Sequence, residues 1–351
     1  MKQEQAAIPP TPRAMTASLA VIIVSYNVRE LLAACLTATF ASLARSSWLR
    51  STVWVVDNAS ADGSADMVAA AFPQAQLIAS PHNLGFAAGN NLVLRRLGFG
   101  GEAPQRASVP AAAGGGEPVT SPQFVLLLNP DAEPMDDAIG QMAVFLADYP
   151  AIGGVGAQLQ YGDGRFQHAA FRFPDLWQLW FDFFPPRPRR LLESRLNGRY
   201  PRRLYAAGQP FPIDFALGAA LMVRGEAIMA AGLLDEGYFM YAEEVDWCWR
   251  MQRAGWPFYC VPAARVIHHG GASAQQFRAQ SFLNLWRSRK RLYDRFYPPT
   301  QRRLAGLIVR LGMWAEARRA RAAAARGAIT AGELGVRLAA IAEVQALFAV
   351  I

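Results

Sequence analysis

The stretch that decides the fold is Leu19-Ala-Val-Ile-Ile-Val24, followed directly by Ser25-Tyr26-Asn27. Six consecutive apolar residues predict a strand that is buried on both faces, as in a parallel sheet covered by helices. Ligands of such sheets bind beyond the carboxyl ends of the strands, so the polar residues that follow are candidates for a binding site.

The chain continues in alternating strand and helix patterns up to about residue 128. This order, with mostly short connections, predicts an α/β fold with a doubly wound and mostly parallel central sheet. The expected helices cover about residues 30–43, 62–71 and 87–97, and the expected strands are Thr52–Val56, Gln76–Ala79 and Phe124–Leu128.

A cluster of polar or small residues follows each expected strand. A single cluster is compatible with a helix cap, and Ser60 and Asp62 fit that explanation. Four clusters at one edge of a sheet are hard to explain as caps and instead predict a nucleotide site. Besides Ser25-Tyr26-Asn27, the clusters are Asp57-Asn58-Ala-Ser60, Asn83-Leu-Gly85-Phe86 and Asn129-Pro130-Asp131.

A second group of polar residues lies far along the chain, where Glu243, Glu244 and Asp246 fall within one helical turn and His268 follows. Crowded acids cost repulsion and desolvation, so a chain that keeps them usually uses them to move a proton or to hold a cation. The alternative is a helix start, where acids favour the macrodipole and Asp246 can pair with Arg250.

These motifs, in this order, resemble those of inverting glycosyltransferases of family 2, and most closely its bacterial rhamnosyltransferase-like branch. The resemblance covers about residues 19–273 and implies a GT-A fold, in which a nucleotide-binding half joins an acceptor-binding half. The matching motifs are Val24-Ser-Tyr-Asn27, Asp57-Asn-Ala-Ser60, Asn83-Leu-Gly-Phe86, Leu128-Asn-Pro-Asp131, Tyr241-Ala-Glu-Glu-Val-Asp246 and His268-x-x-Gly271-x-Ser273.

The resemblance implies roles at the donor site. Tyr26 would stack on the base of the donor, Asp57 would accept the imide N–H of that base, and Asn83 with the glycines after it would line the nucleotide. Packing remains the alternative for Tyr26, and a turn remains the alternative for Gly85. The expected donor-binding residues are Ser25, Tyr26, Asn27, Asp57, Asn58, Asn83, Gly85, Phe86, Asn129 and Asp131.

A divalent metal, Mg²⁺ or Mn²⁺, is also implied, because a departing diphosphate needs charge compensation. Asp131 matches the last acid of the family's Asp-x-Asp motif, whose first acid is replaced here by Asn129. His268 matches a histidine that joins the metal in relatives, and imidazole suits Mn²⁺ better than Mg²⁺. The alternative for His268 is a histidine whose hydrogen bonds are satisfied within the core.

The resemblance assigns the general base to Glu244, with Glu243 and Asp246 beside it in the catalytic group. The family usually has Glu-Asp where this chain has Glu-Glu, and the extra methylene moves the carboxylate by roughly an ångström. The base would take the proton of an acceptor hydroxyl as it attacks the anomeric carbon, and Glu243 would orient the acceptor or the helix. The expected acceptor-side residues are Asp214, Gly218 and Trp247.

The expected organisation is one large domain with an appendage. We expect no nucleic-acid partner, since the chain has no nucleic-acid-binding motif despite its net charge of +8. The expected parts are a disordered tail at 1–17, a GT-A domain at 18–297 with halves at about 18–131 and 132–297, a flexible insertion at about 100–122, and a helical basic region at 298–351.

The chain has no apolar run near the roughly 20 residues that would cross a bilayer, and no apolar stretch typical of a signal peptide. Its cysteines, Cys35, Cys248 and Cys260, lack metal spacing and resemble buried thiols. We therefore expect a cytoplasmic protein.

Two apolar segments next to arginine clusters suggest a membrane surface. Leu176–Phe184 precedes one cluster, and Leu307, Ile308, Leu311 and Trp314 recur at helical spacing near another. Apolar wedges flanked by arginine suit a helix lying in a membrane interface, which predicts attachment to the inner face of the cell membrane. The alternative is that these faces pack on the domain or across a homodimer.

The main functional hypothesis is transfer of a sugar, with rhamnose as the candidate, in cell-surface polysaccharide synthesis. The donor would be dTDP- or UDP-linked, and the acceptor a glycan or a polyprenyl-linked glycan. The rival is a catalytically degenerate nucleotide-sugar-binding or assembly subunit, which the Asn129 and Glu-Glu departures allow. A dinucleotide oxidoreductase is rejected, because no Gly-x-Gly-x-x-Gly turn follows the first strand.

Overall fold

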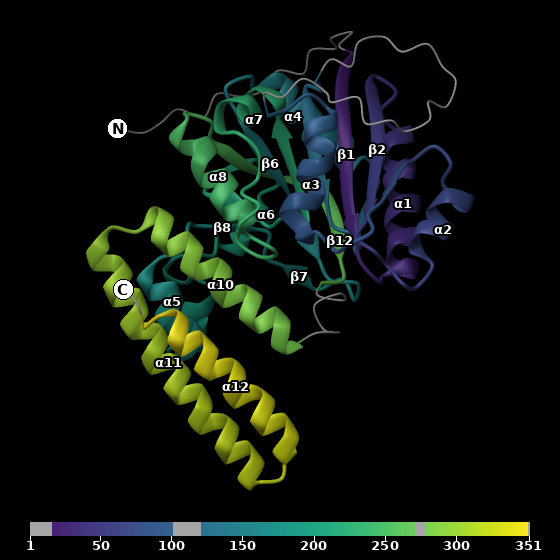
Figure 1. The fold of residues 1–351 in the computed structure, drawn as a ribbon. Helices are drawn as coiled ribbons and strands as arrows, with labels where there is room; N and C mark the ends of the chain where they lie inside the picture. The colour runs from purple at the N-terminus through teal and green to yellow at the C-terminus, as the bar shows by residue number, and fades with distance from the viewer. Residues whose placement is uncertain (1–15, 101–120, 271–277, 350–351) are drawn as a thin grey trace, which may run out of the picture.

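A central β-sheet organises most of the computed structural model, which describes residues 16–100, 121–270 and 278–349. Helices cover both faces of this sheet, and a helical hairpin projects from the body of the molecule (Figure 1). The expected tail at 1–17, the expected insertion at about 100–122, and the motif residues Gly271 and Ser273 lie wholly or mostly outside the described residues.

The N-terminal half of the sheet is parallel, with the strand order β3-β2-β1-β4. The predicted alternation is confirmed, and two predicted strands have the predicted bounds. The strands are β1 (Ala17–Ser25), β2 (Leu49–Asp57), β3 (Gln76–Ala79) and β4 (Phe124–Leu128), and the helices between them are α1 (Arg29–Ala44), α2 (Ser64–Ala71) and α3 (Gly85–Arg96).

The other half of the sheet is mixed and continues in the order β4-β11-β6-β12-β5. Strand β11 (Ala220–Arg224) is antiparallel to both of its neighbours, whereas β12 (Phe258–His268) runs parallel to β6 (Gly154–Gln160). The shorter strands of this half are β5 (Ala132–Pro134), β7 (Phe166–Gln167) and β9 (Phe211–Ile213). Strands β8 (Ala170–Phe171) and β10 (Phe215–Ala216) form a separate antiparallel pair.

Helices of this second half lie between its strands in the sequence. They are α4 (Ala138–Asp148), α5 (Leu176–Phe183), α6 (Arg202–Ala206), α7 (Gly225–Ala231) and α8 (Glu243–Arg253), with short 3₁₀ turns at Arg189–Glu193 and Arg195–Asn197.

The side chains of β1 explain why its sequence is continuously apolar. Leu19, Val21 and Ile23 pack in one core with α1 and α4, and Ala20 and Ile22 pack in the core on the other face. Successive side chains of a strand point to opposite faces, so a strand covered on both sides needs apolar residues throughout. The predicted buried thiols are confirmed, and burial raises the pKa of Cys35 to about 12.

The C-terminal part consists of α10 (Arg278–Phe296), α11 (Pro299–Ala325) and α12 (Ala331–Leu347). Helices α11 and α12 pair in a hairpin, and the Thr330–Glu333 capping box fixes the start of α12. Helix α10 lies against the domain that carries the sheet (Figure 1). Among the described residues, no helix combines the length and the apolar character needed to cross a membrane.

Candidate active site

A cavity of about 440 Å³ lies at the carboxyl ends of β1, β2 and β4, which is a usual size for a small-ligand site. It brings together most of the residues predicted from the sequence, from both halves of the sheet. Those that line it are Ser25, Tyr26, Asn58, Asn83, Gly85, Phe86, Asn129, Asp131, Gly218, Glu243, Glu244 and His268.

Asn27 and Asp57 support this wall without lining the cavity. The backbone N–H of Asn27 donates to Ser60 Oγ at 3.0 Å, and its Oδ1 accepts from the N–H of Ala61 at 2.8 Å. Asp57 Oδ2 accepts from the N–H of Ser60 at 3.0 Å, while its buried Oδ1 has no hydrogen-bond partner among the described residues. The predicted contact between Asp57 and a base stays a prediction.

Gly85 allows the two sides of the cavity to meet. It has a φ of +79°, and a Cβ there would lie 2.3 Å from the carbonyl oxygen of Phe239. Asn58 fixes this turn, donating from Nδ2 to Gly85 O at 3.1 Å, and the N–H of Phe86 donates to Phe239 O at 2.9 Å. Only glycine adopts this φ without strain and also leaves room for the Phe239 backbone.

The two acids at the start of α8 follow a strained turn. Tyr241 and Ala242 have φ values of 73° and 65°, in the left-handed region that non-glycine residues rarely adopt. The turn places Glu243 and Glu244 in the cavity wall, and both residues are buried. Oε2 of each lacks a hydrogen-bond partner among the described residues. Buried acceptors without a partner are rare and mark groups available to a ligand.

The Glu243–Glu244 pair, meaning these two carboxyl groups, differs in how easily each member ionises. Burial raises the pKa of both, and the neighbouring Glu244 charge raises the pKa of Glu243 further. Backbone hydrogen bonds at Gly218 and Val245 favour the charged form of Glu244. These backbone hydrogen bonds make Glu244 the better base of the pair.

Asp131 and His268 form a second polar group in the same cavity. Asp131 Oδ1 lies 3.4 Å from His268 Nε2, and His268 Nδ1 lies 3.2 Å from Gln167 Oε1. Burial raises the pKa of Asp131. The hydrogen bond with His268 and the charge of that imidazole lower it by more, so the pKa is lowered overall. An anionic carboxylate and an imidazole held by a second residue are a suitable donor set for a divalent metal.

Asp131 and His268 can hold a metal as predicted only if the phosphates of the bound donor supply further oxygen atoms. In residues 16–100, 121–270 and 278–349 there is no group of three or more His, Cys, Asp or Glu residues that could hold a metal ion. Asn129, in the place of the missing acid, has its Nδ2 3.4 Å from His268 Nε2. His269 is engaged with Glu133 at 2.8 Å, consistent with the choice of His268.

Comparison with known proteins connects this site to a family. Residues 20–97, which contain β1 to α3, match the model of the family described as glycosyl transferase family 2. With the relatives described next, this match identifies the chain as a glycosyltransferase.

Two bacterial relatives of this glycosyltransferase are rhamnosyltransferases. It is 28% identical over 263 residues to N-acetylglucosaminyl-diphospho-decaprenol L-rhamnosyltransferase of Mycobacterium tuberculosis, a match that covers 73% of this chain and 77% of the relative. It is 33% identical over 70 residues to the rhamnosyltransferase WbbL of Escherichia coli, covering 20% of this chain and 26% of the relative.

A solved structure supports the fold prediction. The mannosyltransferase PcManGT from Pyrobaculum calidifontis, solved with GDP-Man and Mn²⁺, superposes with a TM-score of 0.51 at 17% identity. The match covers 96% of this chain and 88% of that one. The predicted GT-A fold is confirmed at the level of architecture.

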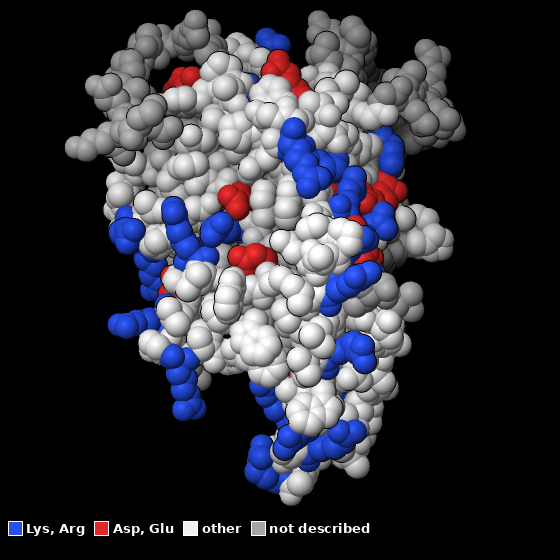
Figure 2. Space-filling model, turned by 90° about the vertical axis from the view of Figure 1, so that its left-hand side faces the viewer, with Lys and Arg blue, Asp and Glu red and all other residues white. Residues whose placement is uncertain are grey.

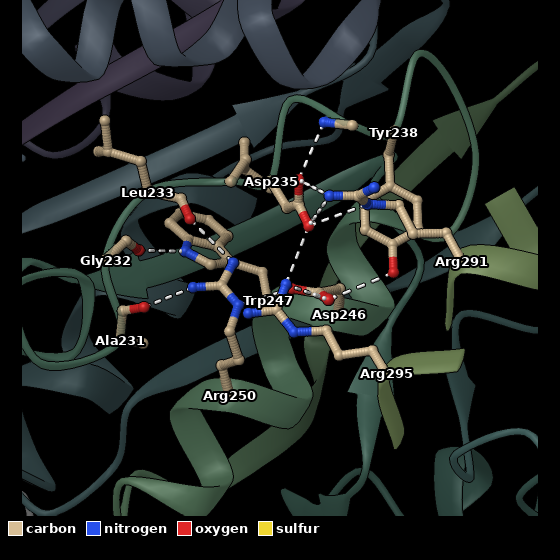
Figure 3. Close-up of polar contacts among 12 residues, drawn as sticks. Ala231, Gly232, Leu233, Asp235, Tyr238, Asp246, Trp247, Arg250, Arg291 and Arg295 are labelled. Carbon is tan, nitrogen blue, oxygen red and sulfur yellow. Dashed lines mark hydrogen bonds and ion pairs between the residues drawn. The ribbon is translucent and has the colours of Figure 1, made fainter. Parts of the chain in front are cut away.

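Asp246 of the glycosyltransferase does not line the cavity, in contrast to the prediction that it belongs to the catalytic group. Its side chain is fully buried, and Figure 3 shows it between two arginines. Oδ1 accepts from Arg250 Nε at 2.6 Å, and Oδ2 accepts from an Arg295 guanidinium nitrogen at 3.0 Å. The i,i+4 ion pair considered for Asp246 is present.

Asp235 completes this network, which no sequence pattern predicted. It accepts from Arg291 and from Arg295, each at 2.9 Å, so α10 is tied to the loop before α8 (Figure 3). Burial raises the pKa of Asp235, but a backbone hydrogen bond and the two arginines lower it overall. The arginines lie 56 and 60 residues along the chain from Asp235, so local sequence carries no signal of the pairing.

Two predicted acceptor-side residues also lie outside the cavity. Trp247 is fully buried, and its Nε1 donates to the carbonyl oxygen of Gly232 at 2.8 Å (Figure 3). Asp214 accepts from the N–H of Phe173 at 2.8 Å and from the hydroxyl of Tyr200 at 3.3 Å. Gly218 does line the cavity, where a Cβ would lie 3.7 Å from Glu244 Cγ.

Helix α10 contributes cavity residues that sequence reasoning missed. Gln280, Ser281 and Asn284 line the cavity, and Gln280 Nε2 donates to Asn284 Oδ1 at 2.9 Å. Ser288 donates to the carbonyl oxygen of Met240 at 2.8 Å and so ties α10 to the turn before the two acids. The family resemblance ends at about residue 273, before α10 begins, and therefore gave no indication of these residues.

Proposed function

We propose that this glycosyltransferase moves a sugar from a nucleoside-diphosphate donor to a hydroxyl group of a glycan, with inversion at the anomeric carbon. The observation that carries the proposal is Glu244, which lines the cavity at the strand ends and whose buried Oε2 has no hydrogen-bond partner among the described residues. A buried carboxylate with one oxygen left without a partner is suited to accept a proton from a bound hydroxyl.

The proposed reaction is a single displacement. The acceptor oxygen bonds to the anomeric carbon while the bond from that carbon to the diphosphate oxygen breaks, and the nucleoside diphosphate leaves with the electron pair. The acceptor proton passes to Glu244. Burial and the neighbouring Glu244 charge raise the pKa of Glu243, and its protonated form can donate a hydrogen bond that orients the acceptor.

Asp131 and His268 are the residues that would hold Mg²⁺ or Mn²⁺ together with the donor phosphates. A divalent cation there would supply positive charge to the leaving diphosphate. Ser25, Tyr26, Asn58, Asn83, Gly85 and Phe86 would contact the nucleotide, since they line the same cavity at the ends of β1 and β2 and at the start of α3.

The relatives favour particular substrates. The name of the M. tuberculosis relative specifies L-rhamnose and a diphospho-decaprenol glycan. We propose a dTDP- or UDP-linked donor, with rhamnose as the candidate sugar, and a polyprenyl-linked glycan in cell-surface polysaccharide synthesis as the acceptor. The reaction would take place at the inner face of the cell membrane.

A donor panel tests this proposal and separates it from a degenerate binding subunit. Thermal shift with dTDP- and UDP-sugars, with and without Mn²⁺, should identify the donor, because a ligand at 100 times its Kd stabilises by about 2.7 kcal/mol. Incubation of that donor with a synthetic lipid-linked N-acetylglucosaminyl diphosphate should then yield an inverted glycoside by NMR. Donor binding with neither hydrolysis nor transfer would favour the degenerate subunit.

A further inference from the structure

The outward face of α11 is apolar at four positions that the core does not use. The buried side of this helix is formed by small and apolar residues such as Ala305, Val309 and Met313. The opposite side exposes large apolar side chains at positions three or four residues apart, which places them in one stripe. They are Leu304, Leu307, Leu311 and Trp314, with exposed fractions of 49%, 52%, 45% and 55%.

Arginines interleave with this stripe. Arg303, Arg310, Arg318 and Arg321 are exposed on the same helix, and the Arg318 guanidinium lies 4.8 Å from the centre of the Trp314 ring. None of the four forms an ion pair with a residue in the described part of the chain. Figure 2 shows the lower part of this face, where the hairpin lies, as blue and white with almost no red.

A second cavity, of about 470 Å³, lies at the start of α11 and adds to the positive charge. It is lined by Lys290, Arg302 and Arg303 together with Tyr293, Asp294, Pro299 and Phe348. Lys290 pairs with Asp294 at 2.6 Å, whereas Arg302 and Arg303 have no ion-pair partner among the residues that the structure describes. This cavity suits an anionic group such as the phosphate of a lipid head group.

We propose that the α11 surface, defined as Leu304, Leu307, Leu311 and Trp314 with Arg303, Arg310, Arg318 and Arg321, binds an anionic phospholipid membrane surface. Apolar side chains would enter the interface while arginines meet the phosphates. A second copy of the chain is the less suitable partner, because a two-fold interface would bring identical arginine clusters together. The inference deepens the membrane location in the proposed function by naming the surface that binds, and its link to a lipid-linked acceptor rests on that proposed function.

Helix α10 connects this surface to the active site. Gln280 and Asn284 near its start line the catalytic cavity, and Lys290 and Tyr293 farther along line the second cavity. The neighbouring helix α5, which packs on α11, exposes Trp177 and Trp180. A membrane bound at α11 would therefore present a lipid-linked acceptor along α10.

Vesicle co-sedimentation of the full chain tests the proposal. The probes are phosphatidylcholine vesicles and equimolar phosphatidylcholine–phosphatidylglycerol vesicles, at about 10 mM and about 1 M salt, where the Debye length is about 30 and about 3 Å. We expect binding only to the mixed vesicles at low salt. Equal behaviour with both vesicles at both salt concentrations would overturn the proposal, and the transfer reaction would be unaffected by that result.

Matched variants separate a specific surface from general attraction of a basic protein. The triple substitution Leu307→Ser, Leu311→Ser and Trp314→Ser should abolish sedimentation, whereas Met229→Ser, at a residue 60% exposed on α7, should not. Each arginine removed from the surface should lower the vesicle partition coefficient by about fivefold. These variants are Arg303→Gln, Arg310→Gln and Arg318→Gln, and the exposed control set is Arg45→Gln, Arg50→Gln and Arg96→Gln.

Three further results would overturn the proposal. Equal losses in the surface and control arginine sets would mean that net charge alone attracts the protein. A switch from dimer to monomer in sedimentation velocity on the triple serine substitution, with vesicle binding unchanged, would assign the surface to a second copy of the chain. Inorganic phosphate should release the protein from the mixed vesicles no better than chloride does at equal ionic strength. Stronger release by phosphate would overturn the proposal, because it would indicate a site for the free anion.

Discussion

The first turn of α8 contains acids with two opposite environments. Glu243 and Glu244 are buried in the cavity wall, and each keeps an oxygen without a hydrogen-bond partner among the described residues. Asp246 is buried as well, but Arg250 and Arg295 contact both of its oxygens. A crowd of acids in the sequence therefore does not identify a catalytic group. A buried carboxyl group that the folded chain does not pair with an arginine or lysine does identify a candidate.

The largest effect on activity is expected from substitution of Glu244, which has no arginine partner. Glu244→Gln should reduce transfer by about 10²–10⁴-fold with donor affinity unchanged, because it removes a positioned base while keeping the shape of the side chain. Steady-state kinetics and calorimetric donor titration measure the two quantities. Glu243→Gln is the matched control and should retain most of the activity, since an amide resembles a protonated carboxyl group. A dead Glu243→Gln beside an active Glu244→Gln would reverse the assignment.

Substitution of Asp246, which is paired with two arginines, should reduce stability and leave donor binding unchanged. Asp246→Ala should lower the free energy of unfolding by about 3–5 kcal/mol, because it leaves Arg250 and Arg295 without their buried partner. Urea unfolding measures this loss, and donor titration of the folded fraction should give an unchanged affinity. If the variant is as stable as the wild type but has lost transfer activity, Asp246 belongs to the catalytic group after all.

A smaller effect, on donor affinity, is expected at Asp131 and His268. The charge of Asp131 would be balanced in part by a metal bound with the donor. Asp131→Ala should weaken donor binding in Mn²⁺ by at least about 10–100-fold, the loss typical of disturbed metal sites, and His268→Ala should weaken it less. Calorimetry with UDP and dTDP, in Mn²⁺ and in EDTA, measures the difference. Nucleotide affinity that is independent of metal in the wild type and in both variants would contradict the metal proposal.

The smallest expected effect is on how the stability of the protein depends on pH, and it comes from the Glu243–Glu244 pair. The pKa of both members of the Glu243–Glu244 pair is raised, so their contribution to stability is full below the ordinary glutamate pKa. This contribution is lost as pH rises through the raised pKa values. The loss amounts to about 1.4 kcal/mol for every pH unit that separates the folded-state pKa from the ordinary glutamate pKa.

Replacement of both acids by glutamine should therefore raise stability relative to wild type more at about pH 8 than at about pH 5. Urea unfolding at the two pH values measures this change, and the exposed Glu226→Gln serves as the control. A pH response equal to that of the control would show that the pair is ionised at little cost in the folded protein.

The features that could be predicted from the sequence are those set by short local patterns, namely strand bounds and the residues that follow each strand. The bounds of β3 and β4 follow from short apolar runs, and the residues at the strand ends meet because parallel strands end at one edge of the sheet. The pairing of Asp246 with Arg295 could not be predicted, because it joins residues 49 positions apart. The place of α10 in the cavity wall was missed for the same reason, since it depends on tertiary packing.

The contact between Gly85 and Phe239 restricts how acceptor preference can diverge in this enzyme. Any side chain at position 85 would displace the Phe239 backbone, so a change meant for the donor side would also move the turn that precedes Glu243. Evolution and protein engineering are therefore expected to retune acceptor choice through α10. A library randomised at Gln280, Ser281 and Asn284 should yield active variants with new acceptors, whereas one randomised at Gly85 should return mainly glycine.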